Sequence, residues 1–190
     1  MCTEIEAKLR VEALKPIELR LVELRADSVG EQMQTDSYFD DASATLTKTD
    51  RCLRLRRILV DRTGRYVLTY KGAKEKDDFK KRQQIELEIQ DAHSFEELLL
   101  ALGYEKKLVL EKKRRLWRLG TCLIALDELP LLGCFVEIEG PDDKAIAAVQ
   151  TDLGLADLAH IVESYAALIQ ARLSELGRED REVYLESASS

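Results

Sequence analysis

The charged residues of this 190-residue chain recur in pairs two positions apart, and acidic and basic pairs fall on different segments. In a strand, residues i and i+2 point to the same face, so each pair presents two like charges together. Two carboxylates placed in this way can share a hard cation such as Mg²⁺ or Mn²⁺, and two cationic side chains can bind successive phosphates. The acidic pairs are Glu4 and Glu6, Glu86 and Glu88, and Glu137 and Glu139, and one basic pair is Arg54 and Arg56.

A second basic pair has two registers, because alternation alone allows Lys112 with Arg114 or Lys113 with Arg115 on one face. The simplest interpretation of all these pairs is a half-solvated antiparallel sheet whose wet face carries the charges. Such a face normally mixes Lys and Glu across neighbouring strands. The sorting of sign by strand therefore favours a polar interior with an anion-binding side and a metal-binding side, suited to a metal-bound polyphosphate.

Hydrophobic periodicity supplies the strands that would carry these pairs. Residues 3–10 alternate between apolar and polar, and seven further segments between turn-rich loops are strand-like, whereas a helical apolar spacing marks four helices. Pro16 begins the first helix and Gly30 ends it, and Ser94 with Glu97 forms a capping box for the second. Short loops between consecutive strands favour an antiparallel sheet, and eight strands are enough to close a barrel. The predicted strands are 3–10, 31–40, 51–60, 66–71, 82–90, 106–118, 121–128 and 134–139, and the predicted helices are 15–29, 94–102, 142–153 and 157–176.

Composition limits the class of protein. The chain is 45% hydrophobic and 34% charged and has no repeat or linker, so we expect one α+β domain at 1–177 and an acidic, frayed tail at 178–190. A net charge of −7 argues against nucleic acid or an anionic membrane as partner. This net charge does not reveal that one region is basic. Between Lys48 and Arg82 basic residues outnumber acidic ones 13 to 5.

The N-terminal segment has charges every second residue, and no stretch of 18 apolar residues follows it. We therefore expect a cytoplasmic protein without a signal peptide or a membrane span. The sequence does not predict a zinc site. Its four cysteines form no CxxC pair, and its two histidines are distant from them.

Eight short motifs lie in one order along most of the chain: EIEAK at 4–8, QTDSYFD at 34–40, LRLR at 53–56, LTYKG at 68–72, IELEI at 85–89, LEKKR at 110–114, ALDELPLLGCFVEIEG at 125–140 and SYAALI at 164–169. The first fits an ExExK signature, and the set resembles the CYTH superfamily, the triphosphate tunnel metalloenzymes. The resemblance implies a closed antiparallel eight-stranded β-barrel, the triphosphate tunnel, with flanking helices. It also implies Mg²⁺ or Mn²⁺ as cofactor and suggests a homodimer.

The resemblance assigns roles position by position. Lys8 matches the signature lysine, either a catalytic base or a phosphate contact, and Asp127 is a further metal ligand or a carboxylate that positions water. Gln84 departs from relatives that often have Arg there, and Arg82 substitutes in part. Glu86 and Glu88 either face the tunnel, where they orient cations or hold a second metal, or are structural. The implied metal ligands are Glu4, Glu6, Glu137 and Glu139, and the implied triphosphate contacts are Arg54, Arg56, Lys71, Lys112 and Arg114.

The QTDSYFD segment and the LPLLGCFVEIEG ending look most like the class IV adenylyl cyclase branch, which converts ATP to cyclic AMP and pyrophosphate. A metal-dependent triphosphatase acting on tripolyphosphate or an organic triphosphate is the alternative, and a non-catalytic nucleotide or polyphosphate binder is the weaker one. In each case the expected partner is a small-molecule triphosphate. Tyr38 and Tyr70 are expected to pack in the barrel wall.

Overall fold

A computed structural model describes residues 2–61, 63–73 and 80–186, and for residues 2–4 and 80–82 it describes the backbone alone. The strands are β1 (Cys2–Val11), β2 (Asp27–Asp41), β3 (Cys52–Val60), β4 (Thr63–Lys71), β5 (Lys80–Ile89), β6 (Tyr104–Leu119), β7 (Cys122–Leu129), β8 (Gly133–Glu139) and β9 (Glu182–Val183). The helices are α1 (Lys15–Glu23), α2 (Thr45–Lys48), α3 (Ala92–Ala101), α4 (Asp143–Asp152) and α5 (Tyr165–Glu175).

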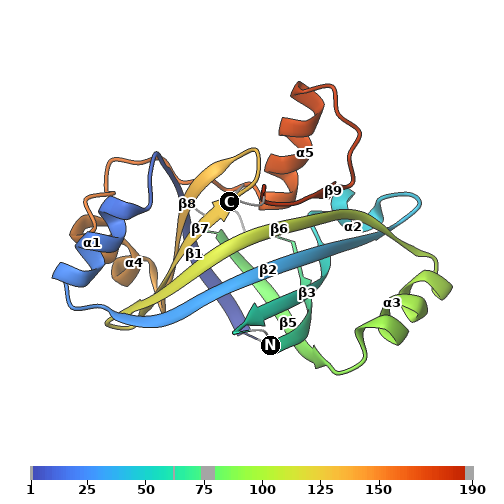
Figure 1. Cartoon of the computed structure of the whole chain (residues 1–190), viewed down its shortest axis with the longest axis horizontal. Helices are drawn as coiled ribbons and strands as arrows, with labels where there is room; N and C mark the ends of the chain where they lie inside the picture. Colours follow the sequence, from blue (N-terminus) through green and yellow to red (C-terminus); the bar gives the residue numbers. More distant parts are fainter. Residues whose placement is uncertain (1, 62, 74–79, 187–190) are drawn as a thin grey trace.

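The strands form one sheet in the order β2-β3-β4-β5-β1-β8-β7-β6-β9, and β2 also pairs with β6. All pairings are antiparallel except that of β9, which runs parallel to β6. The predicted antiparallel sheet with flanking helices is confirmed. Figure 1 shows β2 and β6 side by side along most of the molecule, with α1 and α4 near one end of this pair and α3 near the other.

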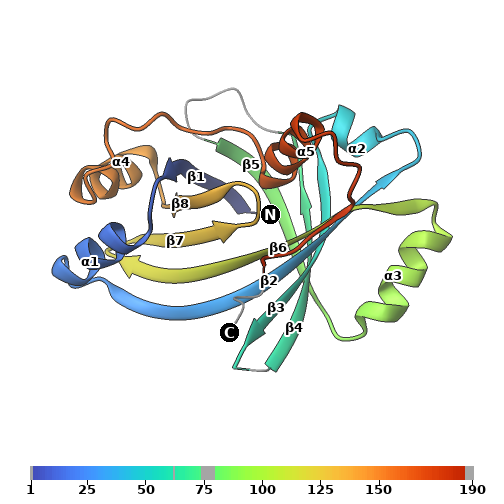
Figure 2. The same cartoon turned by 45° about the horizontal axis from the view of Figure 1, so that its top comes forward.

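The first strand is buried on both of its faces, and this burial separates the core from the polar interior. Ala7 and Leu9 pack into an apolar cluster with residues of α1 and α4, the two helices that Figure 2 shows together beside β1, β7 and β8. Glu6 and Lys8 point the other way and are still only 7% and 2% exposed. A strand with two buried faces therefore carries apolar side chains on one and ionisable side chains on the other.

Two predicted helices are shorter in the structure than expected. The helix predicted at 15–29 ends at Glu23, because Arg25 has a φ of +56° and the chain then turns into β2. Gly30 does not end a helix, and instead takes a φ of +136° in an irregularity of the β2–β6 ladder. The helix predicted at 157–176 begins only at Tyr165, where the Ser164 side chain caps it by accepting a hydrogen bond from the Ala167 amide.

Local hydrogen bonds explain two further differences, and a distant strand pairing explains a third. Asp91, rather than Ser94, caps α3, because its carboxylate accepts the amide of Ser94. The short helix α2 was not predicted, and it is held by the Asp40 carboxylate, which accepts two amides from its first turn. The C-terminal segment, expected as a frayed tail, contributes β9 before residues 187–190, which lie outside the described part. In the described residues no helix has the length and apolar character needed to cross a membrane.

Candidate functional site

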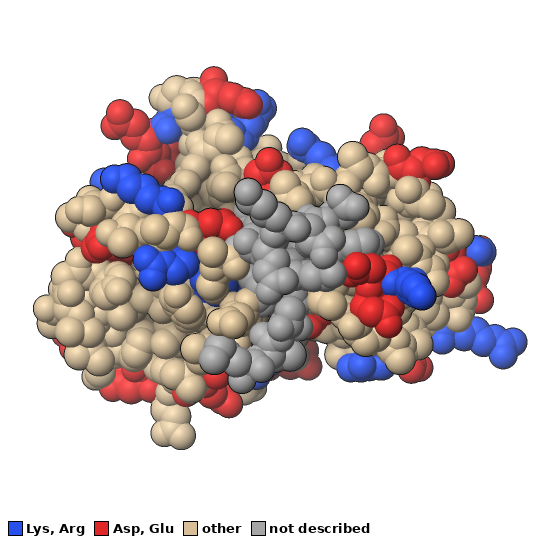
Figure 3. All heavy atoms as spheres, turned by 180° about the vertical axis from the view of Figure 1, so that it is seen from behind, with Lys and Arg blue, Asp and Glu red and all other residues tan. Residues whose placement is uncertain are grey.

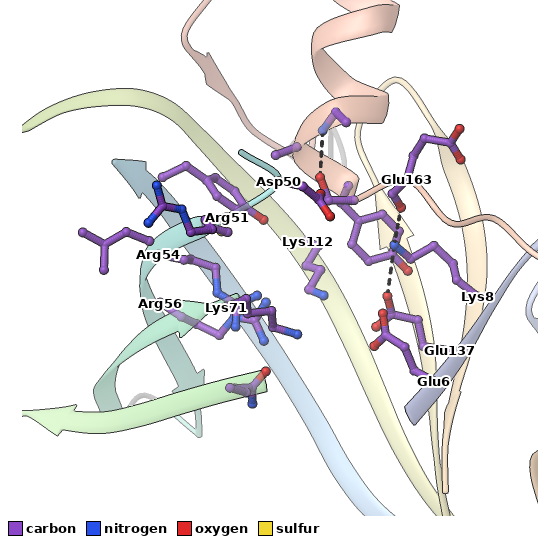
Figure 4. A pocket seen from close by; sticks show the side chains of 18 of the residues that line it. Glu6, Lys8, Asp50, Arg51, Arg54, Arg56, Lys71, Lys112, Glu137 and Glu163 are labelled. Atoms are coloured by element: carbon purple, nitrogen blue, oxygen red, sulfur yellow. Dashed lines mark hydrogen bonds and ion pairs between the residues drawn. The ribbon is translucent and has the colours of Figure 1, made fainter. Parts of the chain in front are cut away.

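A cavity of about 450 Å³ lies among side chains from all eight long strands and from the start of α5. Figure 4 shows basic side chains of β3 and β4 on one side of it and carboxylates of β1 and β8 on the other, with Lys112 between them. We call Arg54, Arg56 and Lys71 the basic wall, and Glu6, Glu137 and Glu139 the acidic wall.

The basic wall is anchored by Asp36 of β2, whose side chain is 1% exposed. Arg56 donates two hydrogen bonds to it, from Nε to Oδ1 at 2.5 Å and from Nη2 to Oδ2 at 2.7 Å, and Arg54 Nη1 lies 3.7 Å from Oδ2. Burial alone would raise the pKa of Asp36, but the two guanidinium groups hold it well below its usual range. The carboxylate therefore stays ionised and fixes the arginines beside the cavity.

A second anchor, Asp127 of β7, is fully buried and binds the two cations of β6. Arg114 donates to it from Nε at 2.6 Å and from Nη2 at 2.5 Å, and Lys112 Nζ donates at 3.2 Å. Arg114 also donates to Glu137, so it joins this anchor to the acidic wall.

Burial affects the two cations of this second anchor differently. It lowers the pKa of Lys112 to about 7, and the neighbouring Arg114 contributes, because together they outweigh the attraction of Asp127. Burial also acts to lower the pKa of Arg114, but Asp127 and Glu137 raise it well above its ordinary value. At neutral pH the arginine is a fixed charge, whereas the lysine is close to losing its proton.

Lys8 lies at the acidic wall and is held by three groups. Its Nζ donates to the backbone carbonyl of Glu163 at 2.9 Å and lies 3.5 Å from Glu137 Oε1. The same Nζ lies 4.0 Å from the centre of the Tyr165 ring. The signature lysine is thus positioned by the segment just before and at the start of α5.

The structure brings most of the predicted site residues to one cavity. It also selects one register, because Lys113 and Arg115 form ion pairs with Glu31 and Glu18 instead of lining the cavity. Gln84, the departure from the family pattern, lines the cavity as well. The predicted residues that line it are Glu6, Lys8, Arg54, Arg56, Lys71, Glu86, Lys112, Arg114, Glu137 and Glu139.

Two predicted residues are placed differently, and the side chains of two others are not described. Asp127 is enclosed by two cations, Lys112 and Arg114. Glu88 lies two residues beyond Glu86 on β5, and its side chain is exposed. Glu4 and Arg82 are paired in the β1–β5 backbone ladder, but their side chains lie outside the described part of the structure.

Sequence reasoning missed several residues of the site. Asp36 was given no role beyond its place in the QTDSYFD motif. It shares an alternating face with Gln34 and Tyr38, and this pattern could have revealed its place in the site. Tyr38 packs in the wall as predicted and also lines the cavity, with its hydroxyl 3.4 Å from Asp36 Oδ2. Tyr165 likewise carried no assigned role. The other missed lining residues with charge are Asp40, Asp50, Arg51, Lys107 and Glu163.

The acidic wall has the oxygen ligands that a hard divalent cation requires. Among the described residues no three His, Cys, Asp or Glu side chains gather closely enough to hold a metal ion by themselves. Mg²⁺ is commonly bound by one or two carboxylates together with substrate phosphates rather than by an all-protein cage. The carboxylates of Glu6, Glu137 and Glu139 therefore fit a cation that is shared with a phosphate group.

Figure 3 shows acidic and basic side chains interspersed over the face of the molecule that it presents. On that face the described Lys and Arg residues do not gather into a broad patch. The described cations that line the cavity lie close together in an enclosed space, which suits a small anion better than a long polyanion.

Comparison with known proteins gives consistent results. A family model described as the CYTH domain matches residues 3–165. A protein of Methanocaldococcus jannaschii, provisionally named an adenylate cyclase, is 27% identical over 162 residues, which cover 85% of this chain and 88% of the relative. A solved structure from Pyrococcus horikoshii OT3 has a TM-score of 0.79 and 28% identity, covering 89% of this chain and 99% of that one.

A further solved structure, from Hippeastrum, is of a protein provisionally named an adenylyl cyclase and described as having a dominant triphosphatase activity. It has a TM-score of 0.67 and 16% identity, and covers 88% of this chain and 95% of that one. It therefore shares the fold.

Proposed function

Because the chain belongs to the CYTH domain family, we propose that it is a divalent-metal-dependent enzyme acting on a substrate with a triphosphate group. The observation that carries this proposal is the division of one cavity into a basic wall and an acidic wall. Guanidinium groups bind phosphate oxygens bidentately, and carboxylates bind the accompanying cation. A simple anion-binding protein would have no use for the acidic wall.

We further infer that the eight long strands close into a barrel around this cavity, as the family resemblance implies. The support is that β2 pairs with both β3 and β6, so that each of the eight has two neighbouring strands. A barrel of eight strands has an interior wide enough to hold one small ligand.

In the proposed reaction the basic wall and the cations of β6 bind the triphosphate oxygens. They hold the triphosphate group in line with the attacking nucleophile. Glu6, Glu137 and Glu139, together with Glu4, hold Mg²⁺ or Mn²⁺. The ion, when bound, neutralises phosphate oxygens and can activate the nucleophile. Lys8, fixed beside Glu137, contributes a further cation at the acidic wall.

We propose ATP as the substrate and cyclic AMP with pyrophosphate as the products, the ribose 3′-hydroxyl being the nucleophile. The name of the M. jannaschii relative supports this choice. The Hippeastrum protein supports the alternative, in which water attacks the terminal phosphorus of tripolyphosphate or an organic triphosphate. Both reactions need the same two walls, so the fold does not decide between them.

The decisive experiment is to incubate the purified protein with Mg²⁺ or Mn²⁺ and either ATP or tripolyphosphate, and to identify the products. Cyclic AMP with pyrophosphate is expected. If orthophosphate forms without cyclic AMP, the protein is a triphosphatase and not a cyclase. If neither substrate yields a product, the proposal that the protein is an enzyme is overturned.

A paired substitution tests the proposed metal ligands in the same assay. Glu137→Gln should lower metal-dependent turnover by at least about a hundredfold, because one anionic oxygen ligand is lost. Glu128→Gln, on the exposed side of β7, should leave turnover unchanged. Equal turnover in the two variants would place the metal elsewhere.

A further inference from the structure

Tyr165, the first residue of α5, lies with its ring against two lysines of the cavity. The ring centre is 4.0 Å from Lys8 Nζ and 4.8 Å from Lys112 Nζ. All three side chains are buried, with Tyr165 5%, Lys8 2% and Lys112 1% exposed. Both ammonium groups therefore lie against the same aromatic ring, at buried positions of the cavity wall.

A buried ammonium group needs favourable contacts because it has lost its water, and on a flexible lysine stem such contacts also decide where the group lies. The attraction of a cation to an aromatic face increases when both are removed from water. The ring itself is held in place, because Phe135 packs edge-on against it at 5.2 Å between centroids and an interplanar angle of 77°. The Ser164 cap fixes where the helix begins and hence where the ring enters the cavity.

We propose that Tyr165 is a positioning residue whose ring holds the ammonium groups of Lys8 and Lys112 at the cavity, where they bind the triphosphate together. This inference rests on the proposed function, since it assigns the two lysines to the triphosphate. It gives α5 a role in the site beyond its packing against the core.

The test compares Tyr165→Leu, which removes the aromatic face, with Tyr165→Phe, which keeps it. The probe is imidotriphosphate, an analogue of tripolyphosphate that resists hydrolysis, titrated calorimetrically in the presence of Mg²⁺. Tyr165→Leu should bind it about tenfold more weakly, the range expected for loss of desolvated cation–π contacts. Tyr165→Phe should bind it within about twofold of the wild type.

Leu173→Ala is the matched control, because it disturbs the same apolar cluster on the same helix without removing the ring or the Phe135 contact that holds it. Its affinity should stay within about threefold of the wild type even where its melting temperature falls. Wild-type affinity in Tyr165→Leu, or an equal loss in Leu173→Ala, would overturn the positioning role.

Crystal structures of the wild type and of Tyr165→Leu provide a readout that needs no ligand. Displaced ammonium groups of Lys8 and Lys112 in the variant would support the inference, and unchanged positions would overturn it. A wild type that binds no imidotriphosphate would count against the proposed function, and the two crystal structures would still decide what the ring does.

Discussion

Two buried aspartates hold the cations of the cavity, and they do so with different partners. Asp36 binds two arginines, whereas Asp127 binds one arginine and one lysine. Arg114, the arginine of the second anchor, also contacts Glu137. In the described residues Arg56 of the first anchor is bound by a single carboxylate, that of Asp36.

The difference separates a fixed charge from an adjustable one. An arginine keeps its proton at any physiological pH, so the Asp36 anchor has a constant charge. The Asp127 anchor contains Lys112, whose pKa is lowered to about 7. Its arginine, Arg114, is also bound by a second carboxylate, that of Glu137. Loss of the first aspartate therefore leaves cations that cannot adjust, whereas loss of the second can be accommodated.

The largest effect is expected for Asp36→Ala. Removal of one partner from a buried ion pair typically costs about 3–5 kcal/mol, because the remaining charge is left uncompensated. Denaturant unfolding should show a loss of this size in the free energy of unfolding. Ser37→Ala, the next residue of the same strand, is the control and should change it by less than about 1 kcal/mol. A small loss for Asp36→Ala would mean that its arginines are stabilised from elsewhere.

The next effect concerns ligand affinity. Arg56→Ala should weaken binding of imidotriphosphate by about 10- to 100-fold, because a bidentate, charge-assisted contact is lost. Arg57→Ala is a matched control, since Arg57 is exposed and points to the opposite face of β3. Calorimetric titration of both variants is the measurement, and equal affinities would place Arg56 outside the phosphate site.

Asp127→Asn should lose about 1–2 kcal/mol of unfolding free energy at pH 8, less than Asp36→Ala. Glu137 remains to hold Arg114, and at pH 8 Lys112, whose pKa is lowered to about 7, carries little charge that would be left without its carboxylate. Denaturant unfolding of both variants under the same conditions checks this order. A loss for Asp127→Asn equal to that of Asp36→Ala would remove the proposed distinction between the anchors.

The smallest effect is a pH dependence that belongs to the second anchor alone. Between pH 7 and about 10 the unfolded chain keeps a proton on Lys112 that the folded protein has released, so this residue makes stability rise with pH. The unfolding free energy of the wild type relative to Lys112→Met should therefore rise by about 1 kcal/mol from pH 7 to 8, below the limit of about 1.4 kcal/mol per pH unit.

Lys113→Met, at the partly exposed neighbouring position, serves as the control for this pH dependence and should show no such trend. A difference between the wild type and Lys112→Met that does not change with pH would mean that the lysine keeps its charge when buried.

The eight long strands were predictable because each combines a strand-like apolar or alternating pattern with recognisable turns around it. The helix boundaries were not, because apolar residues continue past the true ends. Val29 extends the spacing of α1 into β2, and only the positive φ of Arg25 shows where the chain turns. The start of α5 depends on the cap by Ser164, a hydrogen bond that apolar spacing cannot reveal.

Most of the site was predictable from charge pairs and from the family motifs. The choice of Lys112 over Lys113 needed that resemblance, because both registers alternate equally well, and the β2–β6 ladder places Lys112 opposite Gln34. Asp36 and Tyr165 were missed for one reason. Each acts by holding another side chain, and such a role depends on contacts between strands and helices far apart in the sequence.

The pairing of β1 with β8 has a consequence for how the molecule is made. Glu6 lies opposite Glu139 in this ladder. The first strand can therefore form this pairing only after nearly three quarters of the chain has been synthesised. Proteins dominated by such distant pairings fold slowly, in milliseconds to seconds. During synthesis on the ribosome the basic wall of β3 and β4 can form early, whereas the acidic wall is completed only after residue 139 has emerged.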